Sequence, residues 1–383
     1  MRTILNHAAA LLLCALLFFT MVPGQAYGQG PELAAASAVL LDQASGRVLY
    51  GKDADQKRPI ASITKVMTAI LAIESGKMDQ TVRVSANAVR TEGSSIYLKA
   101  GEKIKLRDLV YGLMLRSGND ASLAIAEAVG KSEQGFVFLM NEKAKEIGMT
   151  RTHFTNPNGL ENPDHYSTAY DMALLTRYAM EQPTFRKIVQ TRVYKAQATN
   201  QSDIRVWANK NKMLRLYKYA TGGKTGFTKA AGRTLISTAK KGRIALIVVT
   251  LNDGDDWRDH QQLFEWGFSH FQSTQVACKG KLHAAVAPFY SNRLVLKRSL
   301  YLPLSADERR DLKKTLILVR PQKREGWQPP QPAGRLLVRL DQQTLANLPV
   351  YYQQQKKKKK RFWSLVQMSF GFLISGGEYR PYD

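Results

Sequence analysis

Apolar and polar positions along the chain predict strands first, then helices, then strands again. From Ala36 to Lys52, two apolar runs lie on either side of the turn residues 43–46, which is typical of two joined strands. Between Ser62 and Gly76 the apolar spacing becomes helical. Further helices are expected at residues 106–115, 121–129 and 132–147, and strands return at 233–239 and 244–251. Thr168 and Asp171 have capping-box spacing before one more helix. This order predicts one sheet built from both ends of a domain, with a helical region inserted.

After about residue 275 the pattern changes to short alternating segments separated by Pro/Gly-rich stretches. Such segments lie at 294–296, 316–319 and 336–338, and they predict a small all-β domain. The predicted fold class is therefore α/β in the α+β sense. Its parts are a first domain of antiparallel sheet and helices at 29–275, an all-β domain at 276–352 and a C-terminal amphipathic helix within 353–383.

The first residues have the pattern of a secretory signal. Arg2 supplies a positive charge, Ala8 to Val22 is almost unbroken in its apolar character, and Pro23 and small residues follow. We expect residues 1–28 to be removed, with cleavage after Ala26 or Gly28, and the protein to be exported. A permanent membrane helix is the weaker interpretation, because the run is shorter than the roughly 20 residues that span a bilayer. Of the two cysteines, Cys14 lies in this segment, so Cys278 alone cannot form an internal disulfide.

The net charge of +25 favours anionic partners such as nucleic acid, anionic lipid or acidic wall polymer. The last 108 residues hold 21 basic and 7 acidic residues, and they include the run from Lys356 to Arg361. After this run, Ser364, Gln367, Gly371 and Ser375 would form one polar stripe on an otherwise apolar helix. Such a segment is suited to lie on an anionic membrane surface. The alternative is a terminal helix packed on its own protein, which would not need six consecutive cations.

Three short motifs carry the candidate chemistry. Ser62-Ile63-Thr64-Lys65 is S-x-x-K, Ser117-Gly118-Asn119 is S-x-N, and Lys224-Thr225-Gly226 is K-T-G. Each occurs easily by chance, but their order and context support one another: Ser62 opens a predicted helix, Ser117 lies between two helices, and Lys224 begins a predicted strand.

These residue types fit acyl transfer to a serine. Ser62 and Lys65 are three apart, so on a helix their side chains share a face. Lys65 can take the serine proton only when neutral, which burial and the second cation Lys224 would favour. Ser117 can relay a proton to the leaving amine, and Asn119 can hold the substrate amide. Lys224 and Thr225 can bind a terminal carboxylate, and Gly226 allows a substrate backbone to approach the strand closely.

The chain resembles the penicilloyl-serine transferase superfamily, whose signature is S-x-x-K, S-x-N and K-T-G. More narrowly, it resembles the low-molecular-mass penicillin-binding proteins that act as D-alanyl-D-alanine carboxypeptidases. The stretches that resemble that family are 59–65, 117–121, 156–160 and 224–228.

The resemblance implies a β-lactamase/transpeptidase-like catalytic domain and a serine peptidase of the cell wall. Ser62 would attack the penultimate D-Ala carbonyl of a peptidoglycan pentapeptide ending in D-Ala-D-Ala, expel the terminal D-Ala and form an acyl-enzyme that water hydrolyses. Lys65 would be the base, and the backbone N–H groups of Ser62 and Phe227 would form the oxyanion hole. β-Lactam antibiotics would acylate Ser62. The resemblance also implies attachment to the outer face of the cytoplasmic membrane through the C-terminal helix.

Three other functions compete with this one. A class A-like β-lactamase needs a glutamate in E-x-x-L-N to activate the deacylating water, and none lies between Asn119 and Lys224; Glu161 lacks the pattern. A non-catalytic penicillin-binding sensor or wall-binding protein has no need of both Lys65 and Lys224. Nucleic-acid binding suits the charge but not an exported chain, so we expect no nucleic-acid partner.

No cofactor or metal is expected, because the five histidines of the mature chain have no metal-ligand spacing and are expected to be surface or structural. They are His153, His165, His260, His270 and His283.

Overall fold

The computed structural model describes residues 30–284, 286–324 and 326–354. The predicted signal segment at 1–28 and the amphipathic helix expected within 353–383 lie outside the described residues, except for residues 353 and 354. The chain divides into two compact units. The first runs to Thr274 and also includes Leu302–Ala306, and the second contains the remaining residues from Gln275 onward.

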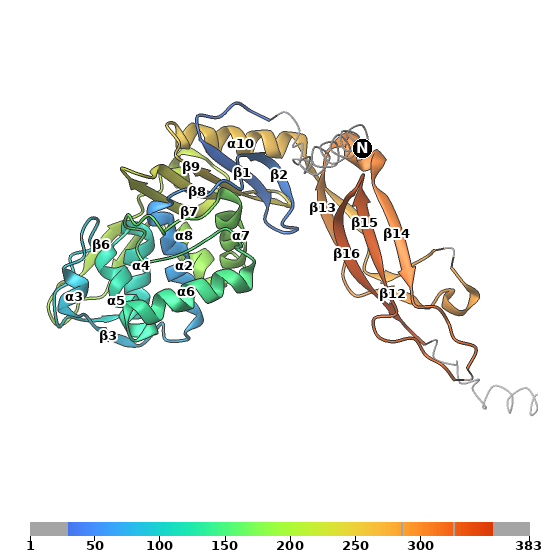
Figure 1. Cartoon of the computed structure of the whole chain (residues 1–383), viewed down its shortest axis with the longest axis horizontal. Coiled ribbons are helices and arrows are strands. Elements are labelled where there is room, and N and C mark those ends of the chain that lie inside the picture. The colour runs from blue at the N-terminus through green and yellow to red at the C-terminus, as the bar shows by residue number, and fades with distance from the viewer. Residues whose placement is uncertain (1–29, 285, 325, 355–383) are drawn as a thin grey trace, which may run out of the picture. The chain divides into compact units, whose positions relative to one another are not determined.

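The first unit is built on a five-stranded antiparallel sheet in the order β2-β1-β9-β8-β7 (Figure 1). Its strands come from both ends of the unit: β1 (Ser37–Asp42), β2 (Val48–Lys52), β7 (Ala220–Thr228), β8 (Gly232–Lys241) and β9 (Ile244–Leu251). Strand β7 forms one edge of this sheet. The predicted class, with an antiparallel sheet and an inserted helical region, is confirmed.

The helical region lies between β2 and β7 in the sequence. Its helices are η1 (Ala61–Thr64, a 3-10 turn), α2 (Lys65–Glu74), α3 (Ala86–Val89), α4 (Leu106–Arg116), α5 (Asn119–Gly130), α6 (Glu133–Ile147), α7 (Ala169–Ala179), α8 (Pro183–Gln190) and α9 (Met213–Leu216). Two short hairpins accompany them: β3 (Thr81–Arg83) with β4 (Lys103–Lys105), and β5 (Val193–Ala196) with β6 (Arg205–Ala208).

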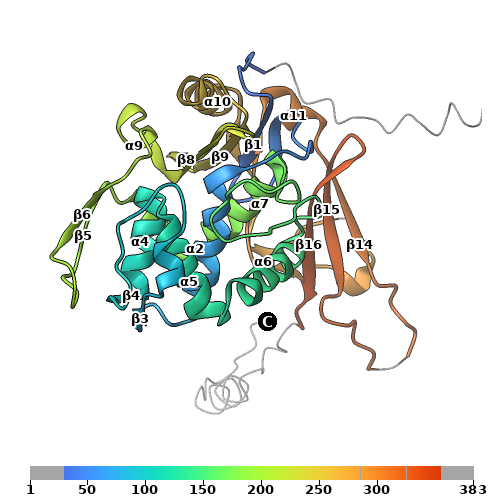
Figure 2. The ribbon, with the colours of Figure 1, turned by 60° about the vertical axis from the view of Figure 1, so that its left-hand side comes forward.

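The sheet has a hydrophobic core on each face, because alternate residues of its strands point to opposite sides. Val39 and Val249 face the helical region, whereas Leu40 and Val248 face α10 (Asp256–His270). Figure 2 shows α10 on one side of the sheet and α2 and α7 on the other.

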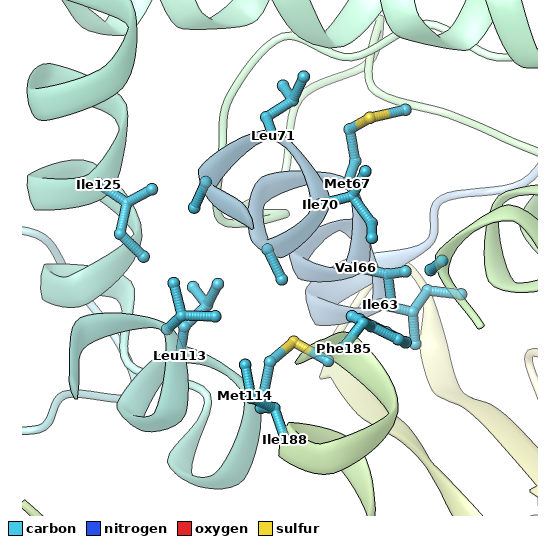
Figure 3. Packing of buried hydrophobic residues seen from close by; sticks show 14 of the residues in the cluster. Ile63, Val66, Met67, Ile70, Leu71, Leu113, Met114, Ile125, Phe185 and Ile188 are labelled. Atoms are coloured by element: carbon cyan, nitrogen blue, oxygen red, sulfur yellow. The ribbon is translucent and has the colours of Figure 1, made fainter. Parts of the chain in front are cut away.

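Helix α2 is the centre of the larger core (Figure 3). Its side chains Val66, Met67 and Ile70 are fully buried and pack among residues of α4, α5 and α8. A helix that is apolar on nearly all sides is buried by its neighbours. Lys65, its first residue, and Ser62 in the turn just before it are therefore held by a helix that is buried in the core.

The second unit has its own five-stranded antiparallel sheet in the order β11-β12-β16-β15-β14. The strands are β11 (Gly280–Lys281), β12 (Leu294–Leu296), β14 (Lys313–Leu318), β15 (Gly334–Leu340) and β16 (Gln343–Tyr352), with η2 (Pro288–Tyr290) beside them. Leu294, Leu336 and Leu348 form part of its separate small core. The remaining elements, at or near the limits of the units, are β10 (Gln272–Ala277), β13 (Leu300–Leu304) and α11 (Ala306–Asp311).

Two local predictions were wrong. Ser62 does not open an α-helix, because Ala61 has a positive φ of 49° and residues 61–64 form a 3-10 turn ahead of α2. Lys224 does not begin its strand but lies at the middle of β7. The capping prediction holds in part: Thr168 accepts the Asp171 N–H at 3.0 Å, but the Asp171 carboxylate turns to Arg151 and Thr152 instead of back to the cap.

Candidate active site

Ser62 and Lys65 meet at the junction of η1 and α2. The Lys65 side-chain nitrogen Nζ lies within hydrogen-bond distance of Ser62 Oγ, at 2.8 Å, and donates to the carbonyl oxygen of Asn158 at 2.6 Å. The 3-10 turn followed by an α-helical turn keeps both side chains on one face, as the spacing of three residues predicts. Lys65 is fully buried, whereas Ser62 is partly exposed, so the hydroxyl can be reached from outside.

The surroundings of Lys65 favour its neutral amine. Burial, followed by the charges of Lys224 and Lys210, holds the pKa of Lys65 well below its ordinary value, and the Asp120 carboxylate offsets this only in part. A neutral lysine amine beside a serine hydroxyl can accept its proton. The short distance and the lowered pKa of Lys65 are what a nucleophile paired with its base requires.

A second pair joins α4 to β7. Lys224 Nζ donates to Ser117 Oγ at 3.1 Å and to the Thr225 carbonyl oxygen at 2.7 Å. Ser117 is the residue that ends α4, in a left-handed conformation with φ 66°. Lys224 is buried to 2% exposure, and burial with the charge of Lys210 lowers its pKa to about 7.

Asn119, at the start of α5, keeps one polar atom unused. Its Nδ2 donates to the Glu92 carbonyl oxygen at 2.5 Å, but the buried Oδ1 accepts no hydrogen bond from the part of the protein that is described. A buried amide oxygen without a donor is costly, which makes it a ready acceptor for a ligand N–H.

Strand β7 brings Thr225, Gly226 and Phe227 past Ser62. A Cβ atom on Gly226 would lie 2.9 Å from the Ser62 nitrogen and 2.4 Å from Thr234 Oγ1. Glycine is therefore needed at 226 to leave the Ser62 N–H uncovered. This reason is more specific than the one expected from the sequence, which was close approach of a substrate backbone to the strand. Phe227 is 66% exposed, and Thr225 is partly exposed.

The loop 155–160 closes the site behind Lys65. Pro157 accepts hydrogen bonds through its carbonyl oxygen from Thr68 Oγ1 at 2.6 Å and Ser122 Oγ at 2.5 Å, which ties the loop to α2 and α5. Asn158 contributes its backbone carbonyl to Lys65, so no side-chain pattern could have revealed that role.

Sequence reasoning also missed Lys210 and assigned no specific role to His165. Lys210 lies between two asparagines with no motif around it, yet its charge lowers the pKa of both Lys65 and Lys224. His165 and His260 prove to be buried, at 3% and 0% exposure, whereas the other three histidines are exposed.

Glu161, the nearest candidate for a lactamase-type base, accepts the Ala230 N–H at 2.8 Å. Among the described residues, no acidic side chain hydrogen-bonds to Ser62 or Lys65, and no group of three or more His, Cys, Asp or Glu side chains is placed to hold a metal ion. The described helices include none that is long and apolar enough to cross a membrane.

The fold and the side chains of the three motifs fit the penicilloyl-serine transferase class that the sequence resembles. A family model described as D-alanyl-D-alanine carboxypeptidase matches residues 25–255, and the chain belongs to that family. It is a serine-type carboxypeptidase by that membership.

Curated relatives match over most of their length. The D-alanyl-D-alanine carboxypeptidase DacF of Bacillus subtilis (strain 168) is 32% identical over 330 residues, which are 82% of this chain and 84% of the relative. The D-alanyl-D-alanine carboxypeptidase DacA of Escherichia coli (strain K12) is 30% identical over 352 residues, which are 86% of this chain and 84% of the relative.

Solved structures agree with these relatives. Penicillin-binding protein 5 of Haemophilus influenzae superposes with a TM-score of 0.72 at 25% identity, covering 86% of this chain and 99% of the other. The D-alanyl-D-alanine carboxypeptidase DacD of Francisella tularensis gives a TM-score of 0.66 at 27% identity, covering 88% and 97%.

Proposed function

We propose that Ser62 carries the carboxypeptidase reaction of this chain through an acyl-enzyme. Neutral Lys65 takes the Ser62 hydroxyl proton while the oxygen attacks the carbonyl of the penultimate D-alanine. The N–H groups of Ser62 and Phe227 stabilise the oxyanion. The C–N bond then breaks, the terminal D-alanine leaves with a proton relayed through Ser117, and water hydrolyses the ester. The observation that carries this proposal is the 2.8 Å distance between Lys65 Nζ and Ser62 Oγ at a fully buried lysine.

The other motif residues would hold the substrate. Lys224 and Thr225 bind the terminal carboxylate, with the Lys210 charge adding to the attraction. Asn119 Oδ1 accepts the substrate amide N–H. Gly226 lets an extended peptide lie along the edge of β7, where backbone hydrogen bonds can align it as an added strand.

The substrate class follows from the family. We propose a peptidoglycan stem peptide ending in D-Ala-D-Ala as substrate, and β-lactams as covalent inhibitors, since a β-lactam presents an amide and a carboxylate in the same arrangement. The lack of an acidic partner for Ser62 or Lys65 among the described residues favours a long-lived penicilloyl-enzyme over a β-lactamase.

The test is intact-mass analysis after incubation with penicillin, together with release of D-alanine from a D-Ala-D-Ala peptide. Ser62→Ala should gain no penicilloyl mass and should release D-alanine about 10³-fold more slowly or worse. Ser75→Ala is the matched control, because the Ser75 hydroxyl bonds the Ala72 carbonyl at the other end of the same helix. A Ser62→Ala variant that still forms the adduct or keeps full activity contradicts the proposal.

We also propose the molecular organisation that the sequence predicts. A signal peptide at 1–28 is removed after export, residues 29–275 form the catalytic domain, 276–352 the all-β domain, and 353–383 a polybasic and amphipathic anchor at the outer face of the cytoplasmic membrane. The charge and apolar pattern of Lys356–Ile374 support the anchor.

A further inference from the structure

The peptide unit just before the nucleophile has an unusual conformation. Ala61 has φ 49°, in a region that costs a non-glycine residue about 1 kcal/mol or more. Its carbonyl oxygen belongs to the same planar peptide unit as the Ser62 N–H, and in a trans peptide the two groups point in opposite directions. Whatever fixes the Ala61 carbonyl therefore also fixes the direction of the Ser62 N–H.

Thr64 and His165 fix that carbonyl by a chain of hydrogen bonds. The Thr155 N–H donates to His165 Nδ1 at 3.1 Å, so the ring hydrogen is on Nε2. Nε2 then donates to Thr64 Oγ1 at 2.8 Å, and Thr64 Oγ1 donates to the Ala61 carbonyl oxygen at 2.8 Å.

This chain of hydrogen bonds is buried, and all its donors point in the same direction, from Thr155 toward Ala61. Burial, with the charges of His153 and Lys65, lowers the pKa of His165 to about 4, which keeps the ring neutral and the direction of donation unchanged at neutral pH. Gly159 closes the other side: a Cβ atom there would lie 2.0 Å from the Ala61 carbonyl oxygen and 2.9 Å from Thr64 Oγ1.

We propose that Thr64 and His165 are positioning residues that orient and polarise the Ala61–Ser62 peptide, so that the Ser62 N–H is a preformed donor to the oxyanion. Each bond in the row Thr155, His165, Thr64, Ala61 points the same way and strengthens the next. A donor held in place before the reaction costs no reorganisation when negative charge develops. The inference rests on the proposed function, in which Ser62 is acylated.

The alternative is that the pair only stabilises the fold, and the molecule contains a matched control for it. His260 Nε2 and Thr250 Oγ1 lie 3.0 Å apart, both residues are fully buried, and burial lowers the pKa of His260 to about 3. This second His–Thr pair links α10 to β9, and neither of its two side chains hydrogen-bonds to Ser62, Lys65, Ser117 or Lys224. If burial and hydrogen bonding alone matter, the two pairs should respond alike to mutation.

The first experiment compares Thr64→Val with Thr250→Val in the full chain. We measure the acylation rate with a fluorescent penicillin, KM and kcat with a D-Ala-D-Ala peptide, and the affinity for a peptide boronic acid, which forms a tetrahedral adduct. Thr64→Val should lower the acylation rate by about 10- to 30-fold and the boronate affinity by the same factor. KM should stay within about twofold, because the substitution weakens only the hydrogen bond from the Ser62 N–H to the oxyanion. Thr64→Ser should restore both quantities, and Thr250→Val should lower Tm without changing either.

A second pair of variants covers the case in which Thr64→Val folds poorly. His165→Gln keeps an N–H donor and an acceptor, whereas His165→Leu keeps only apolar volume. Positioning predicts faster acylation by the Gln variant than by the Leu variant, whereas a packing role predicts the reverse order, since Leu is the better buried residue.

The inference is overturned if Thr64→Val or His165→Leu acylates at the wild-type rate, or if Thr250→Val shows the same loss as Thr64→Val. It is also overturned if Thr64→Val raises KM by the same factor by which it lowers the boronate affinity. These results are distinct from a failure of the proposed function, which would appear as acylation of the Ser62→Ala variant.

Discussion

Two buried lysines dominate the active site at the scale of single residues. Lys65 and Lys224 are 0% and 2% exposed, and neither forms an ion pair among the described residues. An unpaired ammonium ion is expensive to bury, so the neutral amine is favoured and the pKa falls. The folded protein then binds fewer protons than the unfolded chain between the folded and unfolded pKa values. For Lys224 this window runs from about pH 7 to its unperturbed value of 10.5, and its contribution to stability rises with pH there.

The same shift predicts how substrate binding depends on pH. With a pKa of about 7, free Lys224 is mostly neutral above that pH, yet a bound carboxylate requires it to be charged. Binding must then take up a proton, and KM for a D-Ala-D-Ala peptide should rise by up to about tenfold per pH unit above pH 7. The measurement is KM from pH 6 to 9.

A peptide amidated at its C-terminus is the control for this prediction, because it has no carboxylate and its KM should be independent of pH in this range. A KM for the free acid that stays constant from pH 6 to 9 would mean that Lys224 does not bind the carboxylate as a cation.

Single residues also show which parts of the site can be predicted from sequence. Ser62, Lys65, Ser117 and Lys224 stand in motifs, because the chemistry requires those side chains at short spacings. Lys210 acts only through its charge and Asn158 only through its backbone, so neither leaves a pattern. His165 was expected to be surface or structural because the histidines have no metal-ligand spacing, and its link to the site could not be predicted since its partner Thr64 lies 101 residues away.

At the scale of elements, the site depends on where helices and strands begin and end. Ser62 lies in the 3-10 turn before α2, Ser117 ends α4, and Asn119 begins α5. Helices α4, α5 and α6 were predicted from apolar spacing with errors of one or two residues at their ends, whereas α3, α8, α9 and α10 were not predicted. The 3-10 turn was not predicted: it includes the positive φ of Ala61, and the space beside the Ala61 carbonyl depends on Gly159, which is far away in the sequence.

Asp120, in the first turn of α5, secures the loop beside the site. Its carboxylate accepts hydrogen bonds from Ser95 Oγ at 2.6 Å and from the N–H groups of Ile96 and Leu98, each at 3.1 Å. We expect Asp120→Asn to cost about 2–3 kcal/mol, since an amide has one acceptor oxygen where the carboxylate has two. Thermal unfolding should show this as a fall in Tm of about 5–10 °C.

The same variant should also change the pH profile of acylation. The Asp120 charge raises the pKa of Lys65, so removing it lowers that pKa further and moves the acidic limb of the acylation rate to lower pH. Ser95→Ala is the control, because it removes the hydrogen bonds of Ser95 Oγ to Asp120 and from the Tyr97 N–H but removes no charge. An unchanged acidic limb in Asp120→Asn would show that Asp120 does not affect the charge state of Lys65.

At the scale of the whole molecule, charge and chemistry are divided along the chain. The residues of the three catalytic motifs all lie in the first unit, whereas the last 108 residues hold 21 basic and 7 acidic residues. The two units have separate hydrophobic cores.

The proposed anchor leads to a prediction for the whole chain. Deleting residues 356–383 should release the enzyme from membranes into the soluble fraction while leaving D-alanine release unchanged, because the motif residues all lie before residue 275. Fractionation of cells after signal removal measures this. Replacing Lys356–Arg361 by glutamine should weaken membrane retention less than the deletion does. The remaining retention should be insensitive to salt, because the charge attraction that salt screens has been removed. Full retention of the deleted chain on membranes would disprove the anchor.

The sequence by itself determined the order of strands and helices, the fold class and the candidate nucleophile, base and cations, because these depend on apolar spacing and on side-chain types at short range. Only the tertiary structure decided that Ala61 has a positive φ, that Gly226 leaves the Ser62 N–H uncovered, and that Lys210, Asn158 and His165 act on the same centre. These features arise from contacts between segments far apart in the chain, and burial and orientation at such contacts have no local signature.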